Sequence, residues 1–231
     1  DTITHSSYSD SSHIADTAHH LVIQGEDGNE YEINIDSSGN LYTDKIKRFQ
    51  SDSGTFVDQR DGQEYEWVKI GDQVWMAENL NYDQSSFSNW CYNNDPTNCE
   101  KYGRLYEWYP AMQDLCPDGW HLPSKKEWKT LIKYVSNDGY SGIEGKALKS
   151  ITGWVSEGNG LDVYGFTALA GGNRTNNFGN FGNLHHSGNW WTSTEKDGSY
   201  AWQIYLTYLN EDIVIKEVMK TYGFSVRCIK D

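Results

Sequence analysis

Residues 171–191 carry the densest group of side chains suited to recognising a ligand. Their sequence, GGNRTNNFGNFGNLHHSGNWW, interleaves asparagines with phenylalanines and histidines. An asparagine side chain both donates and accepts hydrogen bonds, and an aromatic ring can stack on a sugar ring or clamp a partner. Recognition loops combine adaptable polar groups with rigid aromatic rings in this way. The candidate ligand-binding residues of this stretch are Asn173, Arg174, Asn176, Asn177, Asn180, Asn183, His185 and His186.

The same stretch allows a second interpretation, in which Phe178 and Phe181 pack inward and only anchor a loop rich in glycine and asparagine.

A strand expected over residues 200–208 adds further candidates. One of its faces, expected in the core, carries Trp202, Ile204, Leu206 and Tyr208. The alternation of a strand places Gln203, Tyr205 and Thr207 on the opposite face, where they are candidates for the binding surface.

Four cysteines offer disulfide formation or metal binding. Cys91 and Cys99 flank a turn-rich segment, whereas Cys116 and Cys228 are far apart. An even number of cysteines in an acidic chain rich in Tyr, Trp and Asn indicates two disulfides and an oxidising compartment. Three pairings are available, and we favour Cys91–Cys99 together with Cys116–Cys228. Four reduced thiols are the alternative, whereas no pair has the two-residue spacing of a zinc site.

Residues that could catalyse a reaction lack the context that catalysis requires. Ser193 is not part of a G-x-S-x-G sequence, and the acidic pairs Glu195/Asp197 and Glu211/Asp212 lie on expected loops, where charged side chains are usually solvated. We expect His121, which follows a tryptophan, to be a hydrogen-bonded histidine of the core or of a turn. The adjacent His185 and His186 would point to opposite faces of a strand and make a poor metal site. We therefore assign no catalytic residue and no metal ligand.

The composition is typical of a globular β-rich protein and disfavours two classes of partner. The 231 residues carry a formal net charge of −14, from 33 acidic and 19 basic side chains. Because this charge repels a phosphate backbone, we expect no nucleic-acid partner. No apolar run approaches the roughly 20 residues of a membrane span, so we expect no membrane insertion. The content of 10 Trp and 16 Tyr favours short strands joined by turns.

Four segments are expected along the chain. Residues 1–20 are rich in Ser, Asp and His and should be extended or flexible. Residues 21–49 should form a β-hairpin unit, barely stable alone, that would serve as an oligomerisation or stalk element. Residues 50–60 read as a linker, and residues 61–231 as the main domain.

Helices are expected at three places in the main domain. Ser124 and Glu127 have the spacing of a capping box. Apolar residues then recur at helical spacing, namely Trp128, Leu131, Ile132 and Val135. We also expect a helix over residues 104–113 and a short one around residues 145–149.

Six motifs match a known family. In chain order they are WMAENLNY (75–82), KYGRLYEW (101–108), CPDGWHLPSKKEW (116–128), GFTALAGG (165–172), WWTSTE (190–195) and GFSVRC (223–228). Together they resemble the Fibrobacter succinogenes major paralogous domain over about residues 56–231. The resemblance implies an α+β, C-type-lectin-like domain, related to formylglycine-generating enzymes and to retroelement variable proteins. Such a domain has a twisted antiparallel sheet, two helices and a long loop region. The motif tryptophans expected in its core are Trp75, Trp108, Trp120, Trp128, Trp190 and Trp191.

The resemblance also implies a function. Members of this family look like secreted or surface proteins, so we expect an extracellular or cell-surface location. Cys228 lacks the neighbouring cysteine that formylglycine-generating relatives use, and the chain lacks the calcium-binding motifs of sugar-binding C-type lectins. We therefore expect a non-enzymatic recognition or adhesion module that binds a glycan or protein receptor without a cofactor. A structural calcium held by loop carbonyls would leave no signature in the sequence.

Two other functions compete with this one. Residues 6–20, SSYSDSSHIADTAHH, resemble the Ser/Ala/Asp-rich repeats of phage tail fibres. On that interpretation the chain is the receptor-binding tip of a virion tail, a homo-oligomer assembled through its N-terminal segment. A structural surface-layer protein is the next alternative, and an enzyme is the least favoured one.

Overall fold

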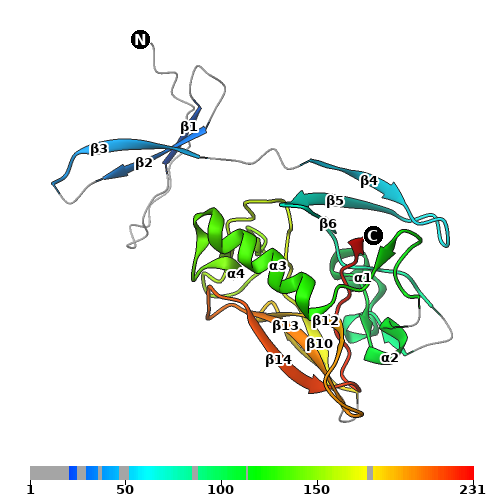
Figure 1. Ribbon diagram of the computed structural model, residues 1–231. Helices are drawn as coiled ribbons and strands as arrows, with labels where there is room; N and C mark the ends of the chain where they lie inside the picture. The colour runs from blue at the N-terminus through cyan, green and yellow to red at the C-terminus, as the bar shows by residue number, and fades with distance from the viewer. Residues whose placement is uncertain are drawn as a thin grey trace. The chain divides into compact units, whose positions relative to one another are not determined.

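The computed structural model divides the chain into two units, Asp1–Arg48 and Phe49–Asp231 (Figure 1). The residues that it describes are 21–24, 30–35, 38–46, 52–84, 88–112, 114–175 and 179–231. Segment 1–20, with its fibre-like sequence, lies outside them. With several antiparallel sheets and few helices, the described part is of the α+β class. No described helix is long and apolar enough to cross a membrane.

The first unit contains a three-stranded antiparallel sheet in the order β1-β2-β3. Its strands are β1 (Leu21–Gln24), β2 (Glu30–Ile35) and β3 (Leu41–Ile46). Ile23 pairs with Tyr31, and Ile35 pairs with Leu41. The unit expected as a hairpin therefore has a third strand.

The second unit opens with a five-stranded sheet in the order β4-β5-β6-β15-β9. Its strands are β4 (Ser53–Val57), β5 (Glu64–Ile70), β6 (Gln73–Met76), β15 (Ile229–Lys230) and β9 (Trp120–His121). Ile229 pairs with Trp75 on one side and with His121 on the other. Strand β15, at the end of the described chain, thereby connects β6 to β9, which comes from the middle of this unit's sequence.

Strand β4 corrects the linker expected at residues 50–60. Residues 53–57 pair along β5. The Phe56 ring lies 5.7 Å from that of Tyr65 and 4.5 Å from that of Trp120. The Ser/Gly-rich composition resembled a linker, but it gave no sign that Phe56 has a surface of the domain to pack against.

A second sheet, β12-β13-β14, has core on both of its faces. Its strands are β12 (Ser187–Glu195), β13 (Tyr200–Thr207) and β14 (Val214–Met219). On one face, Trp190 and Ile204 belong to a core cluster with residues of α3 (Lys125–Val135), which contacts β12 and β13 (Figure 1). On the other face, Trp191 belongs to a second cluster, its ring 4.6 Å from that of Phe224.

Helix α3 forms as its sequence predicts. Ser124 Oγ accepts a hydrogen bond from the Glu127 amide at 3.2 Å, and Glu127 Oε2 accepts one from the Ser124 amide at 2.7 Å. This confirms the capping box. Trp128, Leu131 and Val135 are buried on the face that meets the sheet. Local pattern alone was therefore sufficient to predict this helix.

The remaining elements are short. They are β7 (Asn89–Trp90), η1 (Tyr92–Asn94), α1 (Pro96–Tyr102), β8 (Leu105–Tyr106), α2 (Trp108–Ala111), η2 (Ser136–Tyr140), α4 (Glu144–Leu148), β10 (Gly171–Arg174) and β11 (Phe181–Leu184). Helix α4 confirms the short helix expected there. The helix expected over residues 104–113 is wrong in its first half, because β8 pairs with β7 and the Tyr106 amide donates to Phe224 O.

Two disulfides and the motif tryptophans consolidate the second unit. Cys91 is bonded to Cys99 and Cys116 to Cys228, which is the pairing that we favoured. All six motif tryptophans are buried, as expected.

Candidate functional site

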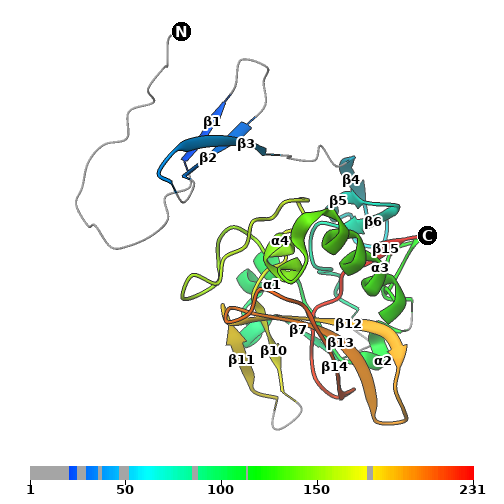
Figure 2. The same cartoon turned by 60° about the vertical axis from the view of Figure 1, so that its left-hand side comes forward.

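The candidate ligand surface is the β10–β11 hairpin, which lies beside β12 with β11 as its outer strand (Figure 2). Arg174 pairs with Phe181 across the hairpin. The Phe181 ring lies 5.4 Å from the ring of Tyr92, so this phenylalanine anchors the hairpin, as the second interpretation proposed. Asn176 and Asn177, at the tip, lie outside the described residues.

Arg174 is a fixed cation at the end of β10, next to the turn of the hairpin. Its guanidinium carbon lies 3.7 Å from the centroid of the Trp90 ring. Its backbone amide and carbonyl both bond to Gly223, at 2.9 Å each. Gly179 has a φ of 67°, and a side chain there would collide with the Arg174 guanidinium. The positive φ is the stronger reason that favours glycine here, because the guanidinium ends a flexible side chain that could move aside.

Three candidates are exposed along the outer edge of the hairpin, namely Asn180, Asn183 and His186. Asn183 and His185 have φ values of 63° and 64°, a region that Asn and His enter more readily than other non-glycine residues. Asn183 Nδ2 donates to Asn173 Oδ1 at 2.8 Å. Its side chain is thus held in place while it remains open to solvent.

The two histidines are oriented by backbone carbonyls. His185 Nδ1 lies 3.0 Å from Gly153 O, and His186 Nδ1 lies 2.8 Å from Leu184 O. A carbonyl only accepts, so each Nδ1 carries a proton. The His186 ring also stands edge-on to Tyr208, at 5.2 Å. In the neutral form, its Nε2 is an acceptor with no hydrogen-bond partner among the described residues.

The other candidates are corrected by their burial. Asn173, Gln203 and Thr207 are only 5%, 2% and 7% exposed. Tyr205 is half-buried, and Lys216 Nζ lies 3.6 Å from its ring centroid. Alternation along β13 gave the correct core face, but the second core cluster covers the opposite face. The surface proposed below does not include these residues.

Five of the six motifs meet at the buried side chain of Asn79. Its Oδ1 accepts from Trp190 Nε1 at 2.8 Å and from Arg227 Nη2 at 2.9 Å. Its Nδ2 donates to Tyr102 O at 2.9 Å, and Arg227 Nη1 donates to Phe166 O. We call this set the Asn79 hub. It shows that the motifs encode a shared scaffold.

A model of the Fibrobacter succinogenes major domain matches residues 68–230. The chain belongs to this family. All six motifs and the whole Asn79 hub lie inside the Fibrobacter succinogenes major domain, whereas β4 precedes it. No curated protein and no solved structure matches the chain significantly.

His121 lies in this Fibrobacter succinogenes major domain, and carboxylates bind both of its ring nitrogens. Nδ1 lies 2.6 Å from Asp231 Oδ1, and Nε2 lies 2.8 Å from Glu127 Oε1. Burial alone would lower the pKa of His121, but the hydrogen bonds to Asp231 and Glu127 raise it above its ordinary value. The expectation of a hydrogen-bonded histidine is confirmed. With both nitrogens occupied, the ring has none left to act as a general base.

Replacing His121 by glutamine is expected to destabilise the protein most at mildly acidic pH. The raised pKa means that the contribution of His121 is complete below the unfolded value of about 6.5 and is lost as pH rises through the folded value. Burial alone would raise the pKa of Glu127, but hydrogen bonds from Ser124 and His121 lower it, so its contribution is lost as pH falls.

Urea denaturation from about pH 5 to about pH 9 checks this prediction. The difference in unfolding free energy between the two proteins should be largest near the acidic end and shrink toward the alkaline end. A difference that stays constant with pH would contradict it.

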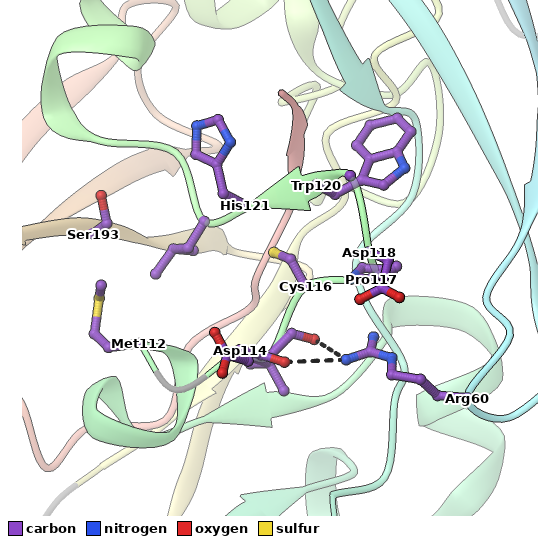
Figure 3. A pocket seen from close by; sticks show the side chains of 12 residues that line it. Arg60, Met112, Asp114, Cys116, Pro117, Asp118, Trp120, His121 and Ser193 are labelled. Carbon is purple, nitrogen blue, oxygen red and sulfur yellow. Dashed lines mark hydrogen bonds between the residues drawn. The ribbon is translucent and has the colours of Figure 1, made fainter.

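Sequence reasoning missed a cleft of about 600 Å³ that is lined by Met112 and residues 114–122, with Arg60 and Ser193 on its walls (Figure 3). Seven of the lining residues, 116–122, are consecutive in the CPDGWHLPSKKEW motif. The motif looked structural because its tryptophans and cysteine belong in the core. The exposed Asp118 and Gly119 between them were the local signal of a surface feature. In the described part, no group of three or more His, Cys, Asp or Glu side chains is arranged to hold a metal ion.

Proposed function

We propose that this chain is a non-enzymatic, extracellular recognition module with a C-type-lectin-like fold, which binds a glycan or protein receptor through its β10–β11 hairpin. The observation that carries the proposal is the group of exposed side chains along and just after β11, namely Asn180, Asn183 and His186, of which Asn183 is bonded to Asn173 and His186 to Leu184 O. Arg174, stacked on Trp90, adds a fixed cation beside them. Oriented amide, imidazole and guanidinium groups are the donors and acceptors that a sugar or a peptide needs.

The fold and the cysteines support the same proposal. The antiparallel sheets, the helix α3, which is the longest helix in the described residues, and the irregular segment between α4 and β10 agree with the architecture that the family resemblance implies. Two disulfides are typical of proteins that work in an oxidising, extracellular environment. Both ring nitrogens of His121 are bound to carboxylates, so this histidine of the motifs is a poor candidate for a catalytic base. This favours a binding function over a catalytic one.

A glycan array probed with the wild-type chain, two test variants and one control variant tests the proposal. Asn183→Ala and His186→Ala should each weaken binding of any hit about fivefold or more, because each removes a hydrogen-bonding group from the surface. Asn137→Ala changes an exposed asparagine after α3 and should leave binding unchanged. A hit that all three variants bind equally well would place the site elsewhere. If the array gives no hit, the same variants are compared by surface pull-down of protein receptors with quantified Kd values.

A further inference from the structure

Strand β4 is the outermost strand of the five-stranded sheet and has β5 on one side of it (Figure 1). In an antiparallel pair, alternate residues direct their backbone groups toward the neighbouring strand and away from it. Asp52 O accepts from the Lys69 amide at 2.7 Å, and the Asp58 amide donates to Gln63 O at 2.8 Å. The even-numbered residues of β4 therefore bond to β5, and the odd-numbered ones direct their backbone groups to the open edge.

Three residues present free backbone groups at this edge, namely Ser53, Thr55 and Val57. Within the described ranges none of their amides has a hydrogen-bond acceptor, whereas Val57 O accepts from Gln59 Nε2 at 3.2 Å. Their side chains are exposed, that of Val57 to 44%. A row of free N–H and C=O groups on an edge strand is a template for one more strand.

Three other edge strands of the second unit have features that discourage such pairing. Strand β9 is only two residues long, β14 carries Lys216 and Glu217, and β11 contains a glycine and an asparagine. Short strands and edge charges are devices with which proteins protect an edge, and glycine weakens a strand. Strand β4 has the sequence SGTFV, without a charge or a proline. It is therefore better suited than these three to accept a further strand.

We propose that β4 pairs antiparallel with β4 of a second copy of this chain, about a two-fold axis at Thr55. In this register Thr55 lies opposite its own counterpart, and Ser53 lies opposite Val57 of the other copy. Every free amide of the strand then gains an acceptor. Phe56 comes opposite Gly54 of the other copy, which leaves room for a ring that is already stacked on Trp120. A two-fold axis requires such a self-complementary surface, and a second copy supplies a strand that is free at the same three positions.

The acidic residues that flank the strand do not oppose this pairing. Asp52 comes opposite Asp58 of the other copy, but the Asp58 carboxylate is fully buried. It accepts from Arg60 Nε and Nη2, at 2.9 and 2.6 Å. Two chains of net charge −14 thus meet along an uncharged strand, and salt at physiological strength screens their other charges beyond about 8 Å.

The pairing gives the protein two binding surfaces at once. Each copy carries one β10–β11 hairpin, so a dimer gains avidity for a receptor that presents several binding sites. Five paired residues bury less than a standard interface of about 1,600 Å², so we expect a reversible dimer with a Kd in the micromolar range. Strand β4 precedes the matched family domain and is separate from the hairpin. The dimer therefore stands or falls independently of the proposed function.

Sedimentation equilibrium of the full chain, at concentrations from about 1 to about 300 μM, tests the proposal. The wild type is expected to show a reversible monomer–dimer equilibrium. Thr55→Pro should weaken it about tenfold or more, because both copies lose an outward N–H while the bonds to β5 remain. Thr55→Val keeps the amide and a β-branched side chain, and its Kd should stay within about twofold of wild type.

Two charge variants test the register. Thr55→Lys and Thr55→Glu should each weaken self-association about fivefold or more, because like charges then lie opposite each other at the two-fold axis. An equimolar mixture of the two should form a heterodimer at least as strong as the wild-type dimer. The side chain of Thr55 is exposed, so these variants should keep the fold, which near-UV circular dichroism checks.

Three results overturn the proposal. The first is a wild-type chain that stays monomeric over the whole concentration range. The second is self-association that Thr55→Pro and Thr55→Lys leave unchanged, which would place the contact elsewhere in the chain. The third is a mixture of the Lys and Glu variants that associates no better than either variant alone, because the two-fold axis would then not lie at Thr55.

Discussion

Replacing Asn79 by leucine is expected to lower the free energy of unfolding by about 3–5 kcal/mol. The side chain is 5% exposed, and its Oδ1 is the shared acceptor for the Trp190 indole and the Arg227 guanidinium. Leucine has a similar volume, so the loss comes from buried donors left without an acceptor. Urea denaturation, with the m-value checked for two-state behaviour, measures the loss.

The charge of Arg227 is the reason for this large effect. The side chain is fully buried, and its hydrogen bonds go to amide and carbonyl oxygens of Asn79, Phe166 and Thr167. Burial lowers the pKa of Arg227 to about 9, so the guanidinium remains charged at neutral pH. Removing the hydrogen-bond partners of a buried cation lowers the free energy of unfolding strongly, because the charge is left unpaired. Removing the cation together with its partners lowers it much less.

A double-mutant cycle isolates this coupling. The double variant Asn79→Leu/Arg227→Met is expected to lose less stability than the two single variants combined, because no buried charge is left unpaired. Asn137→Leu, at an exposed position, should cost less than about 0.5 kcal/mol. Strictly additive losses would show that the Asn79 hub is not an energetic unit.

Removing the Cys116–Cys228 disulfide by alanine substitution at both positions is expected to cost about 5 kcal/mol. The two cysteines are 112 residues apart, and the chain-entropy relation gives that value for a loop of this length. The free energy of unfolding falls mainly because the unfolded chain without the disulfide has more conformational entropy. Truncation of the buried Cys228 to alanine leaves only a small cavity in the folded state. Urea denaturation under non-reducing conditions measures the loss of stability.

The second disulfide is the matched control. Cys91 and Cys99 are 8 residues apart, so the same relation gives only about 2.5 kcal/mol for the Cys91→Ala/Cys99→Ala variant. Both variants lose two sulfur atoms, and the expected difference between them comes from loop length. Equal losses would mean that the long disulfide does not act mainly on the unfolded chain.

These two predictions concern neighbouring residues of one segment. Arg227 joins the Asn79 hub, Cys228 is bonded to Cys116, and Ile229 pairs with both β6 and β9. Three consecutive residues near the end of the chain thus tie together parts that are more than 100 residues apart. Such ties help the long irregular segments of the domain to stay folded.

The sequence by itself determined the features that depend on neighbouring residues. The capping box and apolar stripe of α3 are local, and they predicted the helix correctly because its first turn and its buried face need only a few residues in order. The six motifs predicted the family and a core of tryptophans. The cysteines allowed three pairings, and their separation was enough to favour the right one.

Only the tertiary structure decided which side chains reach the surface. The alternation along β13 indicated one buried face, but Gln203 on the other face is buried too, because it pairs with Trp191, which belongs to a second core cluster built partly from residues 224–228. Likewise, Leu105 and Tyr106 lie in the segment expected to be helical but form β8. Their backbone amide and carbonyl groups pair with β7 and with Phe224. The cleft arises where Arg60, residues 114–122 and Ser193 meet. Burial is a property of what packs against a residue, and a partner distant in sequence leaves no mark on the local pattern.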